Sequence, residues 1–248
     1  MKKLFLIGCL TLLVACQSAT ATPQALETPT PIAATQTPPP TATATMTFTP
    51  APTLTPTPVP LFFTEEFNTD LGAWASFQTG GAEAPTVKLE NDLLRIDLSS
   101  PDTWYYAIYN AHEYSKVFVS AKISGTSAGS IGLICDYSET NGWYEFNLAS
   151  DGTYGVLFGQ WLTQGIAKYT PIANDITEYL QPGNLDYEIG LTCQENLLFL
   201  YINGKLFRKL DVTRYGLAQG KIGINASSFG EVPMIATFDW VKVSEPGQ

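Results

Sequence analysis

The sequence predicts an all-β domain over residues 61–248, built as two packed sheets in a jelly-roll sandwich. Apolar and β-branched residues alternate there with a period of two, and dipeptides that favour turns recur every eight to twelve residues. The apolar spacing that is typical of helices is nearly absent. A dozen or more strands imply two sheets, and 188 residues are enough for a complete hydrophobic core.

The predicted strands follow one another with short connections. Three of these connections carry dipeptides that favour tight hairpins, namely Asn91-Asp92, Asp151-Gly152 and Asn203-Gly204. The strand candidates are TVKLE (86–90), LLRIDLS (93–99), WYYAIYN (104–110), KVFVSAKIS (116–124), SIGLICDYS (130–138), WYEFNLAS (143–150), TYGVLFGQW (153–161), IAKYT (166–170), LDYEIGLTC (185–193), LLFLYI (197–202), KLFRKLDV (205–212), KIGINASS (221–228) and MIATFDWVKVS (234–244).

The first sixteen residues have the anatomy of a signal peptide. Two lysines precede twelve mostly apolar residues, Leu4 to Ala15, which are too few for a membrane-spanning helix of about 20 residues. The tetrapeptide LVAC (13–16) resembles the lipobox of bacterial lipoproteins. That resemblance implies that Cys16 carries palmitate or a similar acyl chain and anchors the protein outside the cytoplasm, to a bacterial membrane or cell surface. The alternative is an ordinary secretory peptide with a chance cysteine.

Residues 17–60 are predicted to be a disordered, Pro/Thr-rich linker. Eleven Pro and fourteen Thr stand among these 44 residues, with Glu27 as the single charged side chain. Repeated Thr-Pro steps remove amide donors and favour extended polyproline II backbone. Such a spacer could hold the domain on the order of 100 Å from the lipid.

The predicted domain is acidic. From Leu61 onward there are eleven Lys or Arg residues against 22 Asp or Glu residues, a formal charge of −11. This charge argues against nucleic acid and anionic lipid surfaces as partners, so we expect contact with a membrane through the lipid anchor only.

The segment WYEFNLAS has bulky residues on both faces, which favours a jelly roll with a groove over a simple sandwich. One face carries Tyr144, Phe146 and Leu148, which we assign to the core. The other face carries Trp143, Glu145 and Asn147. Because their polar groups would be costly to bury between sheets without partners, we expect this face to look out on solvent or a cleft.

Two cysteines remain for the domain, because Cys9 belongs to the predicted signal peptide and Cys16 to the lipid anchor. Cys135 and Cys193 are both in phase with the core residues of their strands. Outside the cytoplasm two such thiols are expected to form a disulfide. The alternative is a pair of buried free thiols.

Four segments together resemble the concanavalin A-like lectin/glucanase superfamily. They are FTEEFNTDLGAW, GLICDYSETNGWYEFNLASDGTYGV, LLFLYINGKLF, and GKIGINASS followed by IATFDWVKV. The likeness is greatest to laminin-G-like and 3-keto-disaccharide-hydrolase-like domains of bacterial surface lipoproteins, and it covers residues 61–248. It implies a curved sandwich whose concave sheet commonly carries the ligand.

The resemblance and the aromatic content together predict a carbohydrate-binding module. We expect a glycan or glycoconjugate as partner, stacked on aromatic rings and hydrogen-bonded by polar side chains. The predicted platforms are Trp143 and Trp161, with Trp104 and Tyr106 as further candidates. The predicted hydrogen-bonding groups are Glu145, Asn147 and Asp136. We assign Trp74 and Trp240 to the core.

A structural or protein-interaction module is the alternative from another class. A concave sheet filled by the protein's own groups would favour that alternative over sugar binding. A glycoside-cleaving enzyme of the same fold is a further alternative, but the sequence lacks the Glu-x-Asp-x-x-Glu run of the laminarinase-type members. Asp136 with Glu145 is the best candidate pair of carboxylates, and Asp186 with Glu188 reads as solvent-exposed. We therefore expect no catalysis.

Few other ligands are compatible with the sequence. His112 is the single histidine and reads as a surface loop residue, which excludes a His-rich metal site. No Gly-rich phosphate loop opens a helix. A structural calcium ion is the one cofactor considered, because pairing of the first and last strands would bring Glu66 near Asp239.

Overall fold

The computed structural model describes residues 58–126, 129–163 and 165–247. The predictions for the signal peptide, Cys16 and the linker up to residue 57 lie outside the described residues. Within this part of the chain, no helix is long and apolar enough to cross a membrane.

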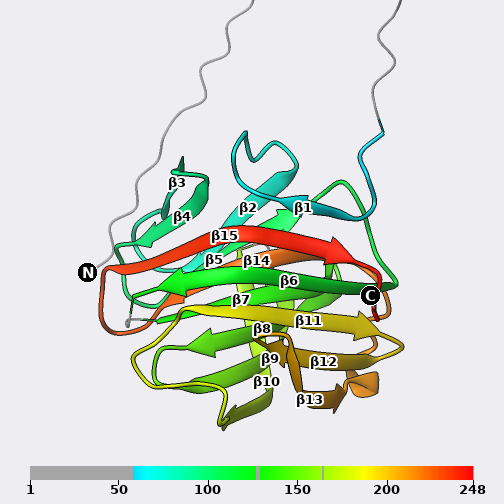
Figure 1. Cartoon of the computed structure of the whole chain (residues 1–248). Helices are drawn as coiled ribbons and strands as arrows, with labels where there is room; N and C mark the ends of the chain where they lie inside the picture. The colour runs from blue at the N-terminus through cyan, green and yellow to red at the C-terminus, as the bar shows by residue number, and fades with distance from the viewer. Residues whose placement is uncertain (1–57, 127–128, 164, 248) are drawn as a thin grey trace, which may run out of the picture. The chain divides into compact units, whose positions relative to one another are not determined.

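The described residues form two antiparallel sheets, which confirms the predicted fold class (Figure 1). Sheet A has the order β13 (Lys205–Asp211), β12 (Leu197–Ile202), β11 (Tyr187–Gln194), β6 (Lys116–Gly125), β15 (Met234–Ser244), β4 (Leu93–Leu98) and β3 (Thr86–Glu90), and β1 (Phe63–Glu65) also pairs with β15. Sheet B has the order β10 (Ile166–Ile176), β9 (Thr153–Thr163), β8 (Gly142–Ala149), β7 (Gly129–Ser138), β14 (Lys221–Ser228), β5 (Thr103–Tyr109) and β2 (Trp74–Gly80). A single turn of 3-10 helix, Thr213–Tyr215, follows β13.

Tight turns join the hairpins where the sequence predicts them. Asn91 and Asp92 have φ of 54° and 58° between β3 and β4, and Asn203 and Gly204 have φ of 49° and 73° between β12 and β13. Two successive left-handed residues fit the right-handed twist of the flanking strands. Strand β2 was not among the predicted strands, and β10 continues to Ile176, beyond the predicted segment 166–170.

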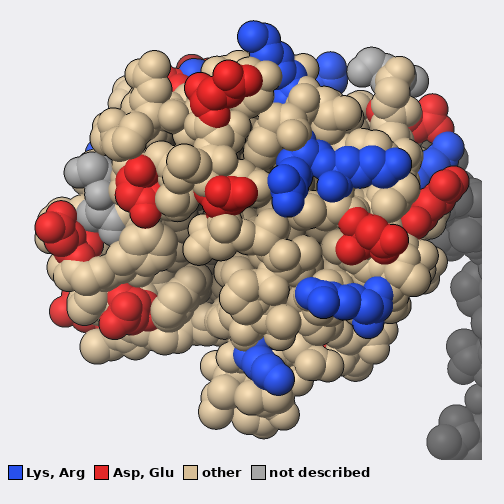
Figure 2. All heavy atoms as spheres, turned by 90° about the horizontal axis from the view of Figure 1, so that it is seen from below, with Lys and Arg blue, Asp and Glu red and all other residues tan. Residues whose placement is uncertain are grey.

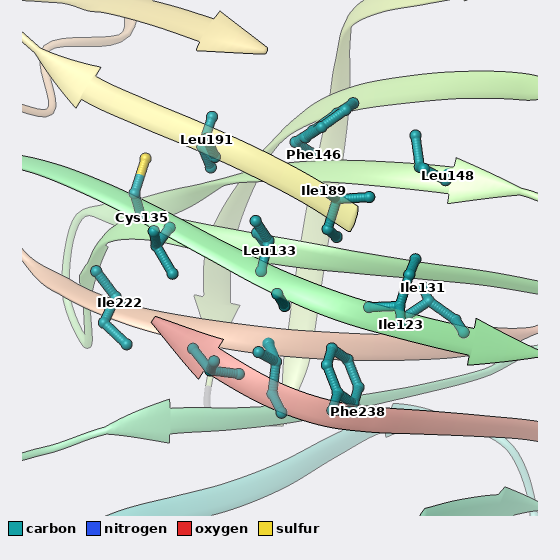
Figure 3. Close-up of a cluster of buried hydrophobic side chains, with 14 of the residues drawn as sticks. Ile123, Ile131, Leu133, Cys135, Phe146, Leu148, Ile189, Leu191, Ile222 and Phe238 are labelled. Carbon is teal, nitrogen blue, oxygen red and sulfur yellow. The ribbon is translucent and has the colours of Figure 1, made fainter. Parts of the chain in front are cut away.

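The core lies between the two sheets. Figure 3 shows Leu133 and Phe146 of sheet B beside Ile189 and Leu191 of sheet A. The predicted inward face of β8 is confirmed, because Tyr144, Phe146 and Leu148 are all fully buried. Each large apolar side chain buried in this way contributes about 1.5–3 kcal/mol to folding.

A disulfide links the sheets across the core, as predicted. Cys135 of β7 and Cys193 of β11 are bonded, with Cα atoms 6.5 Å apart and a sequence separation of 58 residues. Closing a loop of this length stabilises the folded chain by about 4 kcal/mol on the loop-entropy account.

The assignment of two tryptophans to the core is correct for one and wrong for the other. Trp74 belongs to the core cluster. Trp240 is half-buried on the outer face of sheet A, because the pairing of β15 with β6 shifts register between Phe238 and Trp240. This bulge keeps Phe238 and Val241 in the core and turns Trp240 outward.

Acidic and basic side chains are interspersed on the face of the molecule in Figure 2. Among the described residues, Arg95 lies 3.4 Å from Glu90 and 2.7 Å from Asp97. Lys116 pairs with Glu245 at 3.7 Å. The negative charge of the domain is therefore not gathered into one patch on this face.

Candidate functional site

Sheet B curls until its two edge strands meet over its outer face. Thr79 lies on β2 at one edge and Tyr169 on β10 at the other, and their hydroxyl oxygens are 2.8 Å apart. The rings of Phe77 on β2 and Trp161 on β9 have centroids 5.1 Å apart. Strands at opposite ends of a seven-stranded order touch only if the sheet is strongly curved, so this outer face is the concave face.

Aromatic side chains fill the centre of the concave face. With a few aliphatic residues they form one cluster. Its buried members are Tyr106, Ile108, Ile134, Tyr137 and Trp143, and the partly buried residues packed against these are Phe77, Trp104, Trp161, Ala167 and Tyr169. We call these residues the concave-face cluster. Trp143 sits in the middle, with its ring centroid 5.1 Å from that of Trp161 and 5.7 Å from that of Tyr106.

The prediction that this face looks out on solvent or a cleft is wrong for Trp143 and Glu145, whereas Asn147 lines an open pocket. Trp143 and Glu145 are 0% exposed and Asn147 is 8% exposed. The alternation along β8 does place them on the outer face, away from the core between the sheets. They are buried because β9, β10 and β2 bring Trp161, Tyr169 and Phe77 over them, which no pattern within β8 reveals.

The carboxylate of Glu145 is enclosed by hydrogen-bond donors. Trp143 Nε1 donates to Oε1 at 2.6 Å, and the amides of Asn147 and Asn225 donate to Oε2 at 3.1 and 3.3 Å. Burial raises the pKa of Glu145, and the hydrogen bonds from Trp143, Asn147 and Tyr106 oppose that rise. These bonds supply the partners that a buried carboxylate requires.

Tyr106 continues the network toward the sheet edge. Its hydroxyl is 2.7 Å from that of Tyr169, which in turn contacts Thr79. Burial raises the pKa of Tyr106 well above its usual value and that of Tyr169 to about 12, so both phenols stay protonated at neutral pH. The same network thus holds the carboxylate and the two edges of sheet B.

Asn225 on β14 is a member of the network that sequence reasoning missed. Its Nδ2 also donates to Asn147 Oδ1 at 2.8 Å, while its Oδ1 is buried without a hydrogen-bond partner among the described residues. Gly132 leaves room for both amides, since a Cβ there would lie 2.1 Å from Asn147 Oδ1. The available signal was the alternation in KIGINASS, which puts Asn225 and Ser227 on one face.

Beyond the cluster, one end of the concave face holds an open pocket of about 340 Å³. We call it the Trp104 pocket. It is lined by Trp104, Ser130, Asn147, Ala149, Asp151, Thr153, Gly155, Leu157, Pro171, Ala173, Asn174, Ser227 and Phe229. One half-buried indole therefore faces several amide, hydroxyl and carboxylate groups. The ring of Tyr169 stacks 6.0 Å from the Trp104 ring and fixes its orientation.

A second pocket, of about 650 Å³, lies toward the other end of the strands. Ser130, near the start of β7, lines the Trp104 pocket, whereas Tyr137, near its end, lines this one. Its other lining residues are Phe77, Gln78, Glu139, Trp161, Leu162, Thr163 and Gly165. We call it the Trp161 pocket.

The structure thus separates the predicted binding residues. Trp104 and Asn147 share one pocket, and Trp161 lines another. Trp143, Tyr106 and Glu145 are buried in the middle of the concave face, between the two pockets. The described residues therefore form no single platform that holds all of the predicted binding side chains.

Asp136 lines neither of these two pockets. It sits in a bulge of β7 with φ of 51°, between the paired residues Cys135 and Ser138, and is 7% exposed. Burial raises the pKa of this carboxyl to about 7. The bulge breaks the alternation from which Asp136 was predicted to accompany Glu145.

The predicted approach of Glu66 to Asp239 is confirmed. Pairing of β1 with β15 places both residues around one pocket of about 250 Å³, together with Asn68, Asp92 and Trp240. In the described ranges, no group of three or more His, Cys, Asp and Glu side chains is arranged to hold a metal ion.

The other singled-out residues lie at the surface or partly buried. His112 is half-buried in a loop, with Nε2 3.0 Å from the carbonyl oxygen of Val59. Lys122 forms an ion pair with Asp186, and Glu188 is half-buried on the outer face of sheet A.

These features define a two-sheet jelly-roll sandwich of the concanavalin A-like type. No protein-family model matches the chain, and no curated protein matches it either. Solved structures match across most of the sandwich. A Bacteroides ovatus mixed-linkage-glucan GH16 protein, solved in complex with its G4G4G3G product, has 13% identity and a TM-score of 0.53, covering 73% of this chain and 99% of that chain.

Two further structures have the same fold. A Bacillus licheniformis β-glucanase has 15% identity and a TM-score of 0.50, covering 74% of this chain and 98% of its own. A Bacillus subtilis protein with a galectin-like fold has 14% identity and a TM-score of 0.54, covering 74% and 94%. The predicted superfamily resemblance is therefore confirmed at the level of fold.

The wild-type chain is expected to lose stability as the pH rises from about 4 to 7, because of Asp136. The variant Asp136→Asn is expected not to show this loss. The folded chain keeps the Asp136 proton up to about pH 7, whereas unfolded Asp loses it near pH 4. Unfolding in this window releases a proton, so the free energy of unfolding falls with rising pH, by on the order of 4 kcal/mol. Asn tolerates the left-handed backbone at this position.

Urea denaturation of both proteins at pH 4.5 and pH 8 measures this difference. The wild-type chain should lose more stability than Asp136→Asn between these two values. Equal losses in the two proteins would show that Asp136 ionises normally.

Proposed function

We propose that this protein is a membrane-anchored, extracytoplasmic carbohydrate-binding module without catalytic activity, and that it binds glycan in the Trp104 pocket. The observation that carries the proposal is the composition of this pocket on the concave sheet: a fixed, half-buried indole among amides and hydroxyls. A volume of about 340 Å³ falls within the range of small-ligand sites.

The polar groups of the pocket suit a ligand rich in hydroxyls. Asn147 and Asn174 offer amides that both donate and accept, and Ser130 and Ser227 offer hydroxyls that are 2.7 Å apart. Asn225, bonded to Asn147, keeps a buried carbonyl oxygen that lacks a partner among the described residues. Since buried acceptors normally have a donor, a ligand hydroxyl or a water reaching past Asn147 would satisfy it.

The carboxylates argue for binding rather than cleavage. Glycosidases need two carboxyl groups about 5 to 9.5 Å apart on either side of the bond that breaks. Asp151 is the one carboxylate that lines the Trp104 pocket, and its Oδ1 already accepts from the amide and hydroxyl of Thr153. Glu145 is fully buried and engaged by Trp143, Asn147 and Asn225.

Trp104→Ala is expected to lower affinity for a bound glycan about tenfold or more, because it removes the aromatic wall of the pocket. A glycan array identifies the ligand, and titration of the wild-type and variant chains measures the loss. Trp161→Ala is the matched control, because it removes an indole from the other pocket of the same face. Trp143→Ala is unsuitable, since loss of a fully buried Trp costs about 3–5 kcal/mol of stability.

Two results would overturn the proposal. One is a wild-type chain that binds no glycan on the array. The other is equal affinity in the wild-type chain and Trp104→Ala, which would place the glycan elsewhere.

The lipid anchor is a separate part of the proposal and rests on the lipobox-like LVAC segment. Cys16→Ser is expected to abolish incorporation of labelled palmitate in cells, because the acylated thiol is lost. Cys9→Ser is the control and should still be labelled, since Cys9 precedes the acylation site. Labelled Cys16→Ser protein would contradict the anchor at this position.

A structural calcium ion is proposed at the pocket between β1 and β15. Glu66, Asn68, Asp92 and Asp239 line this pocket with oxygen atoms of the kind calcium prefers. They are not gathered into a ligand set in the structure, so a bound ion would draw them together, with carbonyls or water completing its shell. EDTA is then expected to lower the melting temperature by roughly 5–10 °C relative to calcium held about 100-fold above its Kd. Asp239→Asn should reduce this difference. A melting temperature that is the same with EDTA and with calcium would overturn the proposed calcium site.

The second candidate function is a protein-interaction module. The filled centre of the concave face favours it, as do exposed apolar side chains on β9 and β10. Leu162, Ile166 and Ile176 are 64%, 57% and 74% exposed. Leu162 and Ile166 lie together where β9 turns into β10, and Ile176 lies at the other end of the same strand pair. Exposed apolar side chains that lie together are typical of contact surfaces. This function would replace sugar binding if the array shows no glycan.

A further inference from the structure

The outer face of sheet A carries a hollow that is separate from the Trp104 pocket and borders the pocket proposed for calcium, with which it shares Glu66 and Trp240. It measures about 340 Å³ and lies on the opposite sheet from the Trp104 pocket. Its walls include two aromatic side chains, Phe118 of β6 and Trp240 of β15. Its polar lining includes Ser120, Lys242, Glu66 and Glu188. We call it the Trp240 hollow.

The strand register explains why a hollow forms here. Lys242 on β15 lies opposite Ser120 on β6, and Ser120 lies opposite Gly190 on β11. In this row Ser120 is a small residue on the floor of the hollow, and Gly190 leaves the space that the Phe118 ring occupies beside it. The bulge in β15 then turns Trp240 onto the same surface.

Phe118 is held firmly as the second wall. Its ring packs edge-on against Tyr201 with centroids 5.3 Å apart. It also lies over Gly190, where an added Cβ would approach the Phe118 ring to 2.9 Å. A rigid ring at one side and an indole at the other give the hollow two aromatic surfaces.

Several polar groups of the hollow lack protein partners. Ser120 is 3% exposed, and its hydroxyl makes no hydrogen bond within the described residues. In the same part of the chain, Lys242, Glu66 and Glu188 form no ion pair. The neighbouring Lys122 and Lys116, by contrast, pair with Asp186 and Glu245. Because the Ser120 hydroxyl opens into the hollow and is not enclosed, it and the three charged side chains of the hollow are available to a ligand or to water.

We propose that the Trp240 hollow is a second glycan-binding site, which takes one pyranose ring. Trp240 and Phe118 would contact the apolar faces of the ring. Glu66 and Glu188 would accept hydrogen bonds from sugar hydroxyls, and Lys242 and Ser120 would donate to ring or hydroxyl oxygens. The mixture of both charge signs with hydroxyls favours a neutral polyhydroxylated ligand over an anionic or an apolar one.

This site extends the proposed function but shares no residue with the Trp104 pocket, so either site can fail alone. Two sites on opposite sheets would let one domain hold two glycan chains or two segments of one chain. On an insoluble polysaccharide the second attachment raises apparent affinity by an effective-concentration effect.

The test uses the five tryptophans as reporters. Their indole N–H signals in a ¹⁵N-labelled full chain carrying Cys16→Ser distinguish Trp104, Trp161 and Trp240 from the buried Trp74 and Trp143. The probes are cellohexaose, laminarihexaose and xylohexaose, each added in turn. For a hexasaccharide that binds, the Trp104 and Trp240 signals should both shift, while those of Trp74 and Trp143 stay in place.

Variants then assign the second site. Trp240→Ala and Lys242→Met should each reduce the number of hexasaccharides bound per chain from about two to about one by calorimetry, and leave the Trp104 shift intact. Trp161→Ala is the matched control and should retain both sites. An unchanged Trp74 signal confirms that each variant is folded. The Trp143 signal serves the same purpose in Trp240→Ala and Lys242→Met, but not in Trp161→Ala, which removes a ring that packs on Trp143.

The outcomes separate the two proposals. A shift of Trp104 without Trp240 overturns the second site and leaves the proposed function standing. A shift of Trp240 without Trp104 supports the second site and overturns binding in the Trp104 pocket. If neither signal moves with any probe, both are overturned.

Discussion

Burial of the Glu145 carboxylate is the constraint on which the concave face depends. A buried carboxylate must be surrounded by donors, and Trp143, Asn147 and Asn225 supply them. This requirement fixes side chains on β8 and β14. Tyr106 extends the network to Tyr169 and Thr79, so the same polar contacts that satisfy the carboxylate also join the two edges of sheet B. The packing of the aromatic rings and the hydrogen bonds of the buried polar groups therefore stabilise the same strong curvature of sheet B.

That curvature decides where a ligand can bind. With the middle of the concave face filled by the concave-face cluster, the two pockets that the described residues form on this face lie toward the strand ends, at Trp104 and Trp161. The same arrangement removes Glu145 from any reacting position, because its oxygen atoms are already occupied by internal donors. A glycan chain running along the whole concave face is incompatible with this arrangement. A ligand held at one end, around a single indole, is compatible with it.

The two faces of sheet A have different roles. Its inner face contributes the core residues Ile189 and Leu191 and one half of the disulfide, which binds the two sheets together. Its outer face is shaped by the bulge in β15, which releases Trp240 from the core. A single extra residue in one strand thus converts a buried position into a wall of a surface hollow. The charges around that hollow are mixed in sign, in keeping with the interspersed charges elsewhere on the surface (Figure 2).

The sequence by itself determined the features that depend on near neighbours in the chain. Period-two alternation assigned Tyr144 and Phe146 to the core, the turn dipeptides located the hairpins, and the phase of Cys135 and Cys193 predicted their bond. The bulges at Asp136 and Trp240 could not be predicted from the sequence. One inserted residue reverses the inward-outward alternation, and no residue type in these segments signals the insertion. Only the tertiary structure decided that the outward face of β8 is closed. That closure comes from contacts such as Thr79 with Tyr169, 90 residues apart, and a face is open or covered according to what distant strands bring over it.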